Sequence, residues 1–362
     1  MKRMCANVRA GILATVADRS RRICERLLNF ATLAPMSTDP HPYESLTPDA
    51  IMAAVESLGH VCDRRILALN SYENRVYQIG IEGGAPLIAK FYRPGRWPDQ
   101  AIHEEHDFAL ELAADEIPVV PPLVHQGQTL FEYESFRFAL FERRGGRWPE
   151  LGTRTEREWM GRFLGRMHMV GRRQHFRHRD RIDIERLGED SRDYLLEQGW
   201  IPPHLEAAYD SLTGDLLDQI WHAFDVAHGV AEIRLHGDCH RGNVLWTDAG
   251  PHFVDLDDCL SGPAIQDLWM LIAGSRAEMS EQLTQLLEGY THFSSFDRRE
   301  VGLIESLRTL RMIHYSAWLA RRWSDPAFPQ AFPWFEEPRY WENHVLQLRE
   351  QQSAIAEGPL EL

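Results

Sequence analysis

Three polar residues with informative spacing lie in the second half of the chain. Asp238 follows a His-Gly pair, Asn243 comes five residues later, and Asp255 follows a short stretch that is typical of a hairpin. Phosphoryl transfer needs a carboxylate that accepts or orients a hydroxyl proton, together with oxygen ligands that hold Mg²⁺ beside the phosphates. The spacing therefore predicts a phosphoryl-transfer site, with Asp238 as the base and Asn243 and Asp255 as metal ligands.

The lysine content of the chain points to a fourth residue. Lys and Arg together number 39, yet Lys2 and Lys90 are the only lysines. Lys90 lies in the strand-like run 86–92, and its compact ammonium differs from the planar fork of the arginines used elsewhere. A strand lysine that grips the α and β phosphates of ATP needs such a point charge. We therefore expect Lys90 to bind ATP.

A partner for Lys90 is expected on the next helix. A helix is predicted from Pro98 to about Ala114, because the apolar residues recur with helical spacing. At about 100° per residue, Glu105 falls in the middle of the apolar face and Glu104 lies beside it. Since a buried carboxylate needs a cation, the sequence predicts a Lys90–Glu105 ion pair, with Glu104 as the fallback partner.

Three residues near the motif are candidate auxiliary groups. His240 could approach the transferred phosphoryl group or make a structural hydrogen bond. Asp257 could bind a second metal, directly or through water. Asp267, on an otherwise apolar segment, is expected to accept hydrogen bonds from backbone N–H groups of the loop that carries Asp238.

Composition narrows the class of protein. The chain has 362 residues with 44% hydrophobic and 26% charged residues, which is typical of a folded protein with two domains or one large one. The net charge of -15 argues against nucleic acid as the main partner. Five scattered cysteines favour reduced thiols in the cytosol, and no apolar run is long enough to predict a membrane partner.

The first 35 residues differ from the rest. Residues 1–35 carry a net charge of +5 in a chain whose total is -15. This Arg-rich, acid-poor composition resembles an organelle transit peptide. The alternative, which we favour, is an extension upstream of a working start at Met36, and we expect 1–35 to be disordered.

The remainder is expected to form two lobes. Residues 36–144 predict an N-lobe of strands and 145–362 a C-lobe of helices, with the Gly145-Gly146 pair as the hinge. Residues 70–74 precede an alternating strand and are interpreted as a loop that covers phosphates. Because this loop lacks the G-x-G-x-x-G signature, Ser71 and its neighbours would supply hydroxyl and main-chain contacts; a plain polar hairpin is the alternative.

The C-lobe sequence favours packing for most of its aromatic and His residues. Helices are predicted near 155–172 and 203–228, and His168 is interpreted as a packed core residue. Aromatic residues are dense in 306–348, where the initial helical spacing favours the core. The proline-interrupted portion 326–338 cannot be one helix, and a wall of the acceptor site is the alternative there.

Taken together, the motifs resemble those of the aminoglycoside phosphotransferase and choline kinase superfamily, relatives of eukaryotic protein kinases. The matching motifs are His236-Gly-Asp238-x-His240-x-Gly-Asn243, Val254-Asp255-x-Asp257 and Gln266-Asp267-Leu268. Within the superfamily, residues 70–77, 90–94, 262–270 and 313–318 are similar to bacterial serine/threonine protein kinases of the stress response, over roughly residues 40–350.

This resemblance implies both a fold and an activity. The implied fold is α+β, bilobal and protein-kinase-like. The implied enzyme is a monomeric cytoplasmic phosphotransferase that uses ATP and Mg²⁺ and transfers the γ-phosphoryl group to a Ser or Thr hydroxyl of a protein. Position by position, the resemblance makes Asp238 the base, Asn243 and Asp255 the Mg²⁺ ligands, and Ser71 an ATP-contacting residue.

Three alternatives stay open at this point. A small-molecule kinase, acting on an amino alcohol, homoserine or an aminoglycoside-like acceptor, would share every catalytic residue. A binuclear metallophosphatase could use Asp238 and His240, with Asn343 and His344 as further ligands. A pseudokinase binding module is disfavoured because the catalytic residues are intact.

Overall fold

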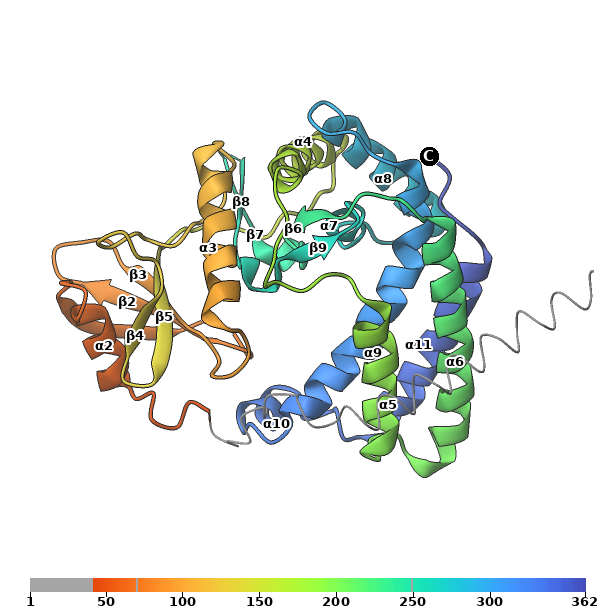
Figure 1. Cartoon of the computed structure of the whole chain (residues 1–362), viewed down its shortest axis with the longest axis horizontal. Helices are drawn as coiled ribbons and strands as arrows, with labels where there is room; N and C mark the ends of the chain where they lie inside the picture. The colour runs from red at the N-terminus through yellow and green to blue at the C-terminus, as the bar shows by residue number, and fades with distance from the viewer. Residues whose placement is uncertain (1–41, 70, 249) are drawn as a thin grey trace, which may run out of the picture. The chain divides into compact units, whose positions relative to one another are not determined.

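The computed structural model describes residues 42–69, 71–248 and 250–362, so the predicted extension 1–35 lies outside the described residues. In the described residues of the N-terminal part, five strands lie with two helices, and Figure 1 shows α2 and α3 beside the strands. These elements are α2 (Pro48–Glu56), β1 (Cys62–Ala68), β2 (Arg75–Ile81), β3 (Leu87–Phe91), α3 (Asp99–Ala114), β4 (Phe131–Tyr133) and β5 (Phe136–Glu142).

The strands form one antiparallel sheet in the order β1-β2-β3-β5-β4. In the centre of the sheet, Lys90 of β3 lies opposite Val76 of β2 and Ala139 of β5. Side chains alternate between the two faces of a strand, so Lys90 and the buried pair Ala89 and Phe91 point to opposite faces. Strand register thus decides which face of the sheet receives the ammonium.

The two faces of the sheet are covered by different helices. Helix α2 begins where the Thr47 hydroxyl accepts a hydrogen bond from Ala50 N, with Pro48 in the first turn. Its buried residues Ile51 and Val55 belong to the same apolar cluster as Phe91. Helix α3 buries Ile102 against the opposite face, where Tyr92 and Ala139 lie.

The described residues of the C-terminal part are mainly helical and include two small two-stranded sheets, one of which is a hairpin. Its α-helices are α4 (Arg154–Gly171), α5 (Asp190–Glu197), α6 (Pro203–Val226), α7 (Gln266–Trp269), α8 (Arg276–Tyr290), α9 (Ile304–Arg322), α10 (Ala327–Ala331) and α11 (Pro338–Ala356). The strands are β6 (Ile233–Leu235), β7 (Val244–Thr247), β8 (Gly250–Phe253) and β9 (Leu260–Gly262). Short π and 3-10 segments are η1 (Glu185–Glu189), η2 (Arg241–Asn243), η3 (Leu256–Asp258) and η4 (Arg298–Leu303).

The predicted hinge connects β5 to α4 along a strand of the C-terminal part. Arg147 pairs with Trp246 of β7 through hydrogen bonds of 3.0 and 2.7 Å between their backbones. A Cβ atom at Gly146 would lie 2.9 Å from the backbone of Leu245, so only glycine fits this close approach. The pair Gly145-Gly146 therefore joins the two parts by a short extended segment.

The predicted α+β organisation is confirmed, with the sheet in the N-terminal part and helices dominating the C-terminal part. The prolines of 326–338 interrupt the helix as expected, because α10 ends at Ala331 and α11 begins at Pro338. His344 is buried beside the Tyr340 ring, so it is a packed residue rather than the ligand that the metallophosphatase alternative requires. Within residues 42–69, 71–248 and 250–362, none of the helices has the length and apolar character needed to cross a bilayer.

Candidate active site

The loop after β6 places Asp238 through a turn that requires glycine. Gly237 has a φ of +84°, and a Cβ atom there would lie 2.1 Å from the carbonyl oxygen of Asp258. Gln266 donates from its side chain to the Gly237 carbonyl at 2.9 Å. These contacts therefore fix the conformation of the turn that precedes Asp238.

The carboxylate of Asp267 holds this loop from behind. Its two oxygens accept hydrogen bonds from the backbone N–H groups of His236 and Gly237 at 2.8 and 2.9 Å. His168 contacts the same carboxylate at 3.1 Å from the buried face of α4. The structure thus bears out both expectations: Asp267 supports the loop, and His168 is a core residue.

Neighbouring side chains form hydrogen bonds and ion pairs with Asp238. The side-chain amide of Asn243 donates to the Asp238 carbonyl at 3.0 Å and to Oδ2 at 3.3 Å. His240 Nε2 lies 3.4 Å from Oδ2, and Arg311 Nη1 lies 2.7 Å from Oδ1. Among the described residues, however, none donates a hydrogen bond of good geometry to the buried Oδ1 atom. Oδ1 is therefore held by the charge of Arg311.

The neighbours of Asp238 also set its ionisation. Burial by itself would raise the pKa of Asp238, but the contact with His240 and the positive charge of Arg311 outweigh it, so the pKa lies below its usual value. Because His240 Nδ1 accepts a hydrogen bond from Gly242 N at 2.9 Å, the neutral ring carries its proton on Nε2, facing Asp238. Asp238 is therefore an anion throughout the physiological pH range.

The β7–β8 hairpin brings Asn243 and Asp255 together. Val244 at the start of β7 pairs with Phe253 at the end of β8, and Val254 N donates to the Asn243 carbonyl at 3.0 Å. Asp255 adopts a left-handed conformation with φ 61° and ψ 65°, which is uncommon for a residue with a side chain and is often found at functional sites. Its carboxylate is 57% exposed and lies 3.5 Å from Lys90.

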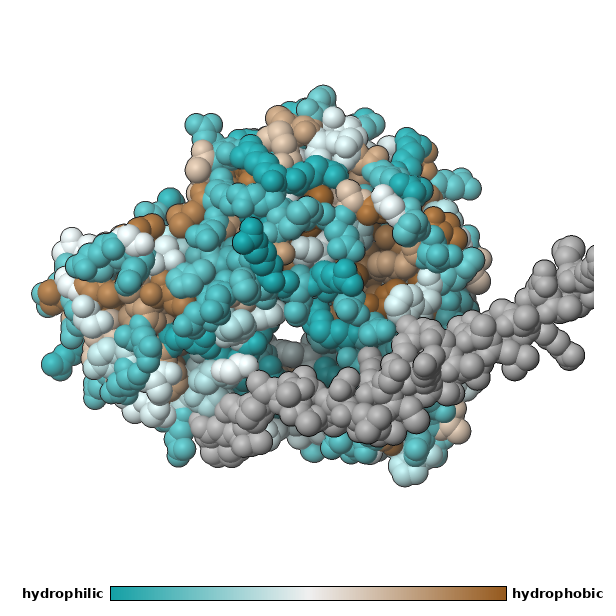
Figure 2. Space-filling model, in the orientation of Figure 1, coloured by the Kyte–Doolittle hydropathy of each residue, from teal (hydrophilic) through white to brown (hydrophobic). Residues whose placement is uncertain are grey.

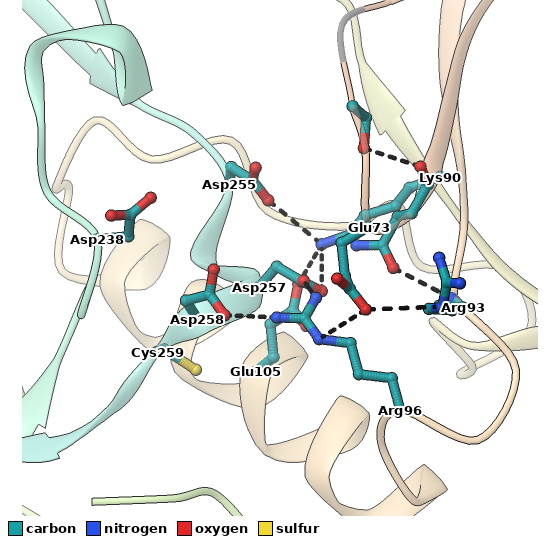
Figure 3. Close-up of polar contacts among 12 residues, drawn as sticks. Glu73, Lys90, Arg93, Arg96, Glu105, Asp238, Asp255, Asp257, Asp258 and Cys259 are labelled. Atoms are coloured by element: carbon teal, nitrogen blue, oxygen red, sulfur yellow. Dashed lines mark hydrogen bonds and ion pairs between the residues drawn. The ribbon is translucent and has the colours of Figure 1, made fainter. Parts of the chain in front are cut away.

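Lys90 is the centre of the second half of the site. Its buried ammonium lies 3.0 Å from Glu105 Oε1 and 3.0 Å from Asp257 Oδ1, in addition to its contact with Asp255 (Figure 3). The predicted Lys90–Glu105 ion pair is therefore present. In the view of Figure 3, the exposed carboxylate of Asp255 lies between Asp238 and Lys90.

Asp257 and Glu105 lie equally close to Lys90 but differ in their ionisation. Burial would raise the pKa of Asp257, but the charges of Arg96 and Lys90 outweigh it and hold the pKa low. Burial raises the pKa of Glu105, and the attraction of Lys90 only partly opposes that change. For Lys90, the charges of Asp257 and Glu105 outweigh burial and hold its pKa well above the usual value. The ammonium thus stays charged despite its burial.

Sequence reasoning missed the arginine that completes this cluster. Arg96, in the loop before α3, forms ion pairs with Asp257 and Asp258 and lies 3.7 Å from Glu73. Glu73 belongs to the predicted phosphate-covering loop and is also paired with Arg322 of α9 at 2.9 Å. The only signal in the sequence was an acid, Glu73, in a polar loop. The sequence does not show that this acid is buried and therefore needs a cation such as Arg96.

Glu104 binds backbone N–H groups of a loop and not Lys90. It accepts hydrogen bonds from the backbone N–H groups of residues 177–179 at 2.7 to 3.0 Å. This places the Arg179 side chain in the interior, where it donates to the Asp257 and Cys259 carbonyls and lies over the Trp97 ring. The fallback pairing of Glu104 with Lys90 is therefore wrong, because Glu104 fixes a loop instead.

Ser71 does not join these clusters. Its hydroxyl donates to the Asn74 carbonyl at 3.0 Å, within the turn before β2, while Asn74 Oδ1 accepts from Arg93 N at 3.1 Å. The turn is thus internally bonded and attached to the end of β3. On the face shown in Figure 2, the surface is hollowed near the middle of the molecule, and the coloured residues beside the hollow are mainly hydrophilic.

Comparison with known proteins identifies the family. The model of a phosphotransferase enzyme family matches residues 65–304. Stress response kinase A of Escherichia coli (strain K12) is 45% identical over 330 residues, which cover 90% of this chain and 99% of the relative. Serine/threonine protein kinase RdoA of Salmonella typhimurium is 44% identical over 327 residues, with the same coverage. The chain therefore belongs to this phosphotransferase family.

Solved structures agree with the fold. A microcompartment-associated aminopropanol kinase superposes with a TM-score of 0.63 at 18% identity, over 84% of this chain and 98% of that chain. An amicoumacin kinase solved with AMP-PNP and Ca²⁺ has a TM-score of 0.59 at 19% identity, over 77% of this chain and 88% of that chain. The bilobal fold predicted from the motifs is thus the fold of known small-molecule kinases, while the relatives with high identity are stress response kinases.

Proposed function

We propose that this chain is an ATP-dependent serine/threonine protein kinase of the bacterial stress response, a phosphotransferase with an alcohol group as acceptor. The single observation that carries the proposal is the arrangement of the acids: the Asp238 carboxylate follows a fixed turn, and the exposed Asp255 carboxylate lies 3.5 Å from the buried Lys90 ammonium. Support for a protein acceptor comes from the relatives, which are named as a stress response kinase and as a serine/threonine protein kinase.

In this proposal Asp238 orients the acceptor hydroxyl. Its carboxylate would accept the hydroxyl proton, while Asn243 and His240 hold Oδ2 and Arg311 lies beside Oδ1. A carboxylate with a low pKa is a weak base, which suits a loose transition state in which positioning and electrostatics supply most of the catalysis. Asp238 would thus act by aligning the oxygen nucleophile more than by early proton removal.

The residues around the hairpin fit a Mg²⁺ ion. Asn243 turns its Nδ2 toward Asp238, and no described residue donates to its Oδ1, while Asp255 exposes more than half of its carboxylate. Amide and carboxylate oxygens are the hard ligands that Mg²⁺ accepts from proteins, usually only one or two of them beside phosphate oxygens. Asn243 and Asp255 would hold the Mg²⁺ ion, which would supply positive charge to the phosphates of ATP.

Lys90 would hold the α and β phosphates, with Glu105 and Asp257 keeping the ammonium in place. Ser71 and its turn would cover the phosphates from the N-terminal part. As part of the same proposal, the enzyme acts as a cytoplasmic monomer on protein substrates, and the net charge of -15 is consistent with a partner other than nucleic acid.

The test is transfer of radiolabel from γ-labelled ATP. The purified protein is incubated with Mg²⁺ and either a mixture of bacterial proteins or a panel of amino alcohols, homoserine and aminoglycosides. We expect acid-stable label on Ser or Thr of proteins and little on the small molecules. Efficient labelling of a small molecule and none of protein would contradict the proposal and favour the small-molecule kinase.

A further inference from the structure

Helix α9 presents one stripe of side chains along the site. Arg311, Tyr315, Trp318 and Arg322 fall within about 60° of one another at 100° per residue, and they extend over about 16 Å of helix. At one end Arg311 contacts Asp238, and at the other Arg322 contacts Glu73. The stripe therefore runs from the proposed base to the loop that precedes β2.

The two ends of the stripe differ in solvent exposure and in how many of their polar groups have partners. Trp318 donates to Glu73 at 2.7 Å, and Arg322 pairs with the same carboxylate, so this end is closed. By contrast, Arg311 is 45% exposed and Tyr315 is 38% exposed. Tyr72, which is 40% exposed, packs its ring against Phe332, and the Phe332 ring in turn contacts Trp318. Open surface is thus concentrated next to Asp238.

Arg311 has donors to spare, unlike the other arginines of α9. Arg308 is paired with Glu305, Arg321 donates to the Asp190 carbonyl, and Arg322 is held by Glu73. Among the described residues, only Asp238 contacts the Arg311 guanidinium, through Nη1. A guanidinium has five N–H donors, so most of those of Arg311 can bind an incoming anion.

The sign of charge on this wall is positive. Glu305 is the single acid in the α9 sequence and forms an ion pair with Arg308. The acids around the cluster, Asp257, Asp258 and Glu73, are paired with Arg96 or Arg322. A cationic acceptor that approached Asp238 would meet Arg311, whereas an acceptor with a nearby carboxylate would gain charge-assisted hydrogen bonds.

From these observations, and resting on the proposed kinase function, we infer that Arg311 selects the acceptor: the substrate segment is an extended peptide that carries an Asp or Glu close to its Ser or Thr. The open end of the stripe, from Arg311 to Tyr315, covers about 6 Å of helix, the length of about two residues of extended chain. Arg311 binds the acidic side chain, and Tyr315 and Tyr72 offer flat surfaces to the peptide. The same tyrosines could also stack on a quaternary ammonium, but Arg311 disfavours that occupant.

The test compares acceptors of opposite charge. Ser peptides that differ only in having Asp, Ala or Lys beside the serine, together with choline, are phosphorylated by wild type, Arg311→Ala and Arg311→Glu. Wild type is expected to favour the Asp over the Lys peptide by about 10- to 100-fold in kcat/KM, as a charged hydrogen bond provides. Arg311→Ala is expected to abolish this preference through KM, and Arg311→Glu to reverse it.

Arg154→Ala is the matched control. Arg154 is also an exposed arginine paired with acids, Glu158 and Glu288, but on α4, so the peptide preference should be unchanged. Unfolding midpoints of all variants report folding. Peptide phosphorylation without charge preference, or a kcat that rises equally for every acceptor in Arg311→Ala, would overturn the role of Arg311 alone. Phosphorylation of choline and of no peptide would overturn the proposed function together with this inference.

Discussion

The two halves of the candidate site differ in burial and in how their charges are paired. On the Lys90 side, Lys90, Glu105 and Asp257 are each at most 5% exposed, and every charge has a buried counter-charge. On the Asp238 side, the carboxylate is paired with Arg311 at 2.7 Å, and Arg311 and Tyr315 are themselves partly open to solvent. We therefore expect substitutions on the Lys90 side to affect stability and activity together, and substitutions on the Asp238 side to affect activity alone.

The largest effect is expected on the open side. Asp238→Asn removes the acceptor of the hydroxyl proton, and turnover should fall by about 10²- to 10⁴-fold. Nucleotide binding and the unfolding midpoint should change little, since Asp238 forms no part of the buried cluster. Steady-state kinetics and denaturant unfolding check this, and a loss of stability comparable to the loss of activity would contradict the comparison.

On the buried side, Lys90→Met should destabilise the protein by about 3–5 kcal/mol, because it leaves Glu105 and Asp257 buried with less positive charge. Urea unfolding measures the change, and nucleotide titration should show weakened binding as well. A native unfolding midpoint would show that the cluster does not need its ammonium.

The same cluster allows a sharper comparison of its two acids. Asp257 has two cations and a low pKa, whereas burial raises the pKa of Glu105. Asp257→Asn should therefore destabilise the protein more than Glu105→Gln, and Lys90→Met combined with Glu105→Gln should recover part of the loss of Lys90→Met alone. The reverse order would mean that Glu105 is the main partner.

A smaller effect should appear as pH dependence on the buried side. Burial lowers the pKa of His106 to about 3, with its ring bonded to Tyr92 and Thr129. The unfolded chain takes up this proton near the usual pKa of about 6.5, so the folded state loses stability as the pH falls from about 6.5 toward 3. His106→Gln should lose less stability between pH 7 and about pH 4 than wild type does, as measured by unfolding at both pH values. An identical loss in both proteins would remove His106 from this account.

The smallest effect is expected outside both halves of the site. Arg154→Ala breaks exposed ion pairs with Glu158 and Glu288, and such pairs contribute little because water screens them. Neither the unfolding midpoint nor turnover should change measurably. A clear change in either would show that exposed charge contacts matter here as much as buried ones.

Much of the buried side could be predicted from the sequence because its signals are local. Glu105 was placed by helical periodicity, and Lys90 by its strand-like run and by its rarity. On the other side, Asp267 was placed by the need of a buried acid for donors.

The remaining contacts could not be predicted because they join distant residues. Arg96 meets Asp257 across 161 residues, and the chain uses arginine so widely that one more in a loop has no distinctive signal. Arg311 was assigned only to a helix rich in packed aromatics, since periodicity gives the face of a helix but not the element that it crosses. The fallback choice of Glu104 failed for the same reason, as residues 177–179 approach it from another part of the fold.

The central claim is that Asp255 and Asn243 hold the metal while Asp238 serves the acceptor, and nucleotide binding tests it most directly. Calorimetric titration of a non-hydrolysable ATP analogue, with and without Mg²⁺, is compared for wild type, Asp255→Asn and Asp238→Asn. The account predicts that Asp255→Asn loses the strengthening by Mg²⁺ while Asp238→Asn binds like wild type. Binding by Asp255→Asn with undiminished dependence on Mg²⁺ would contradict it.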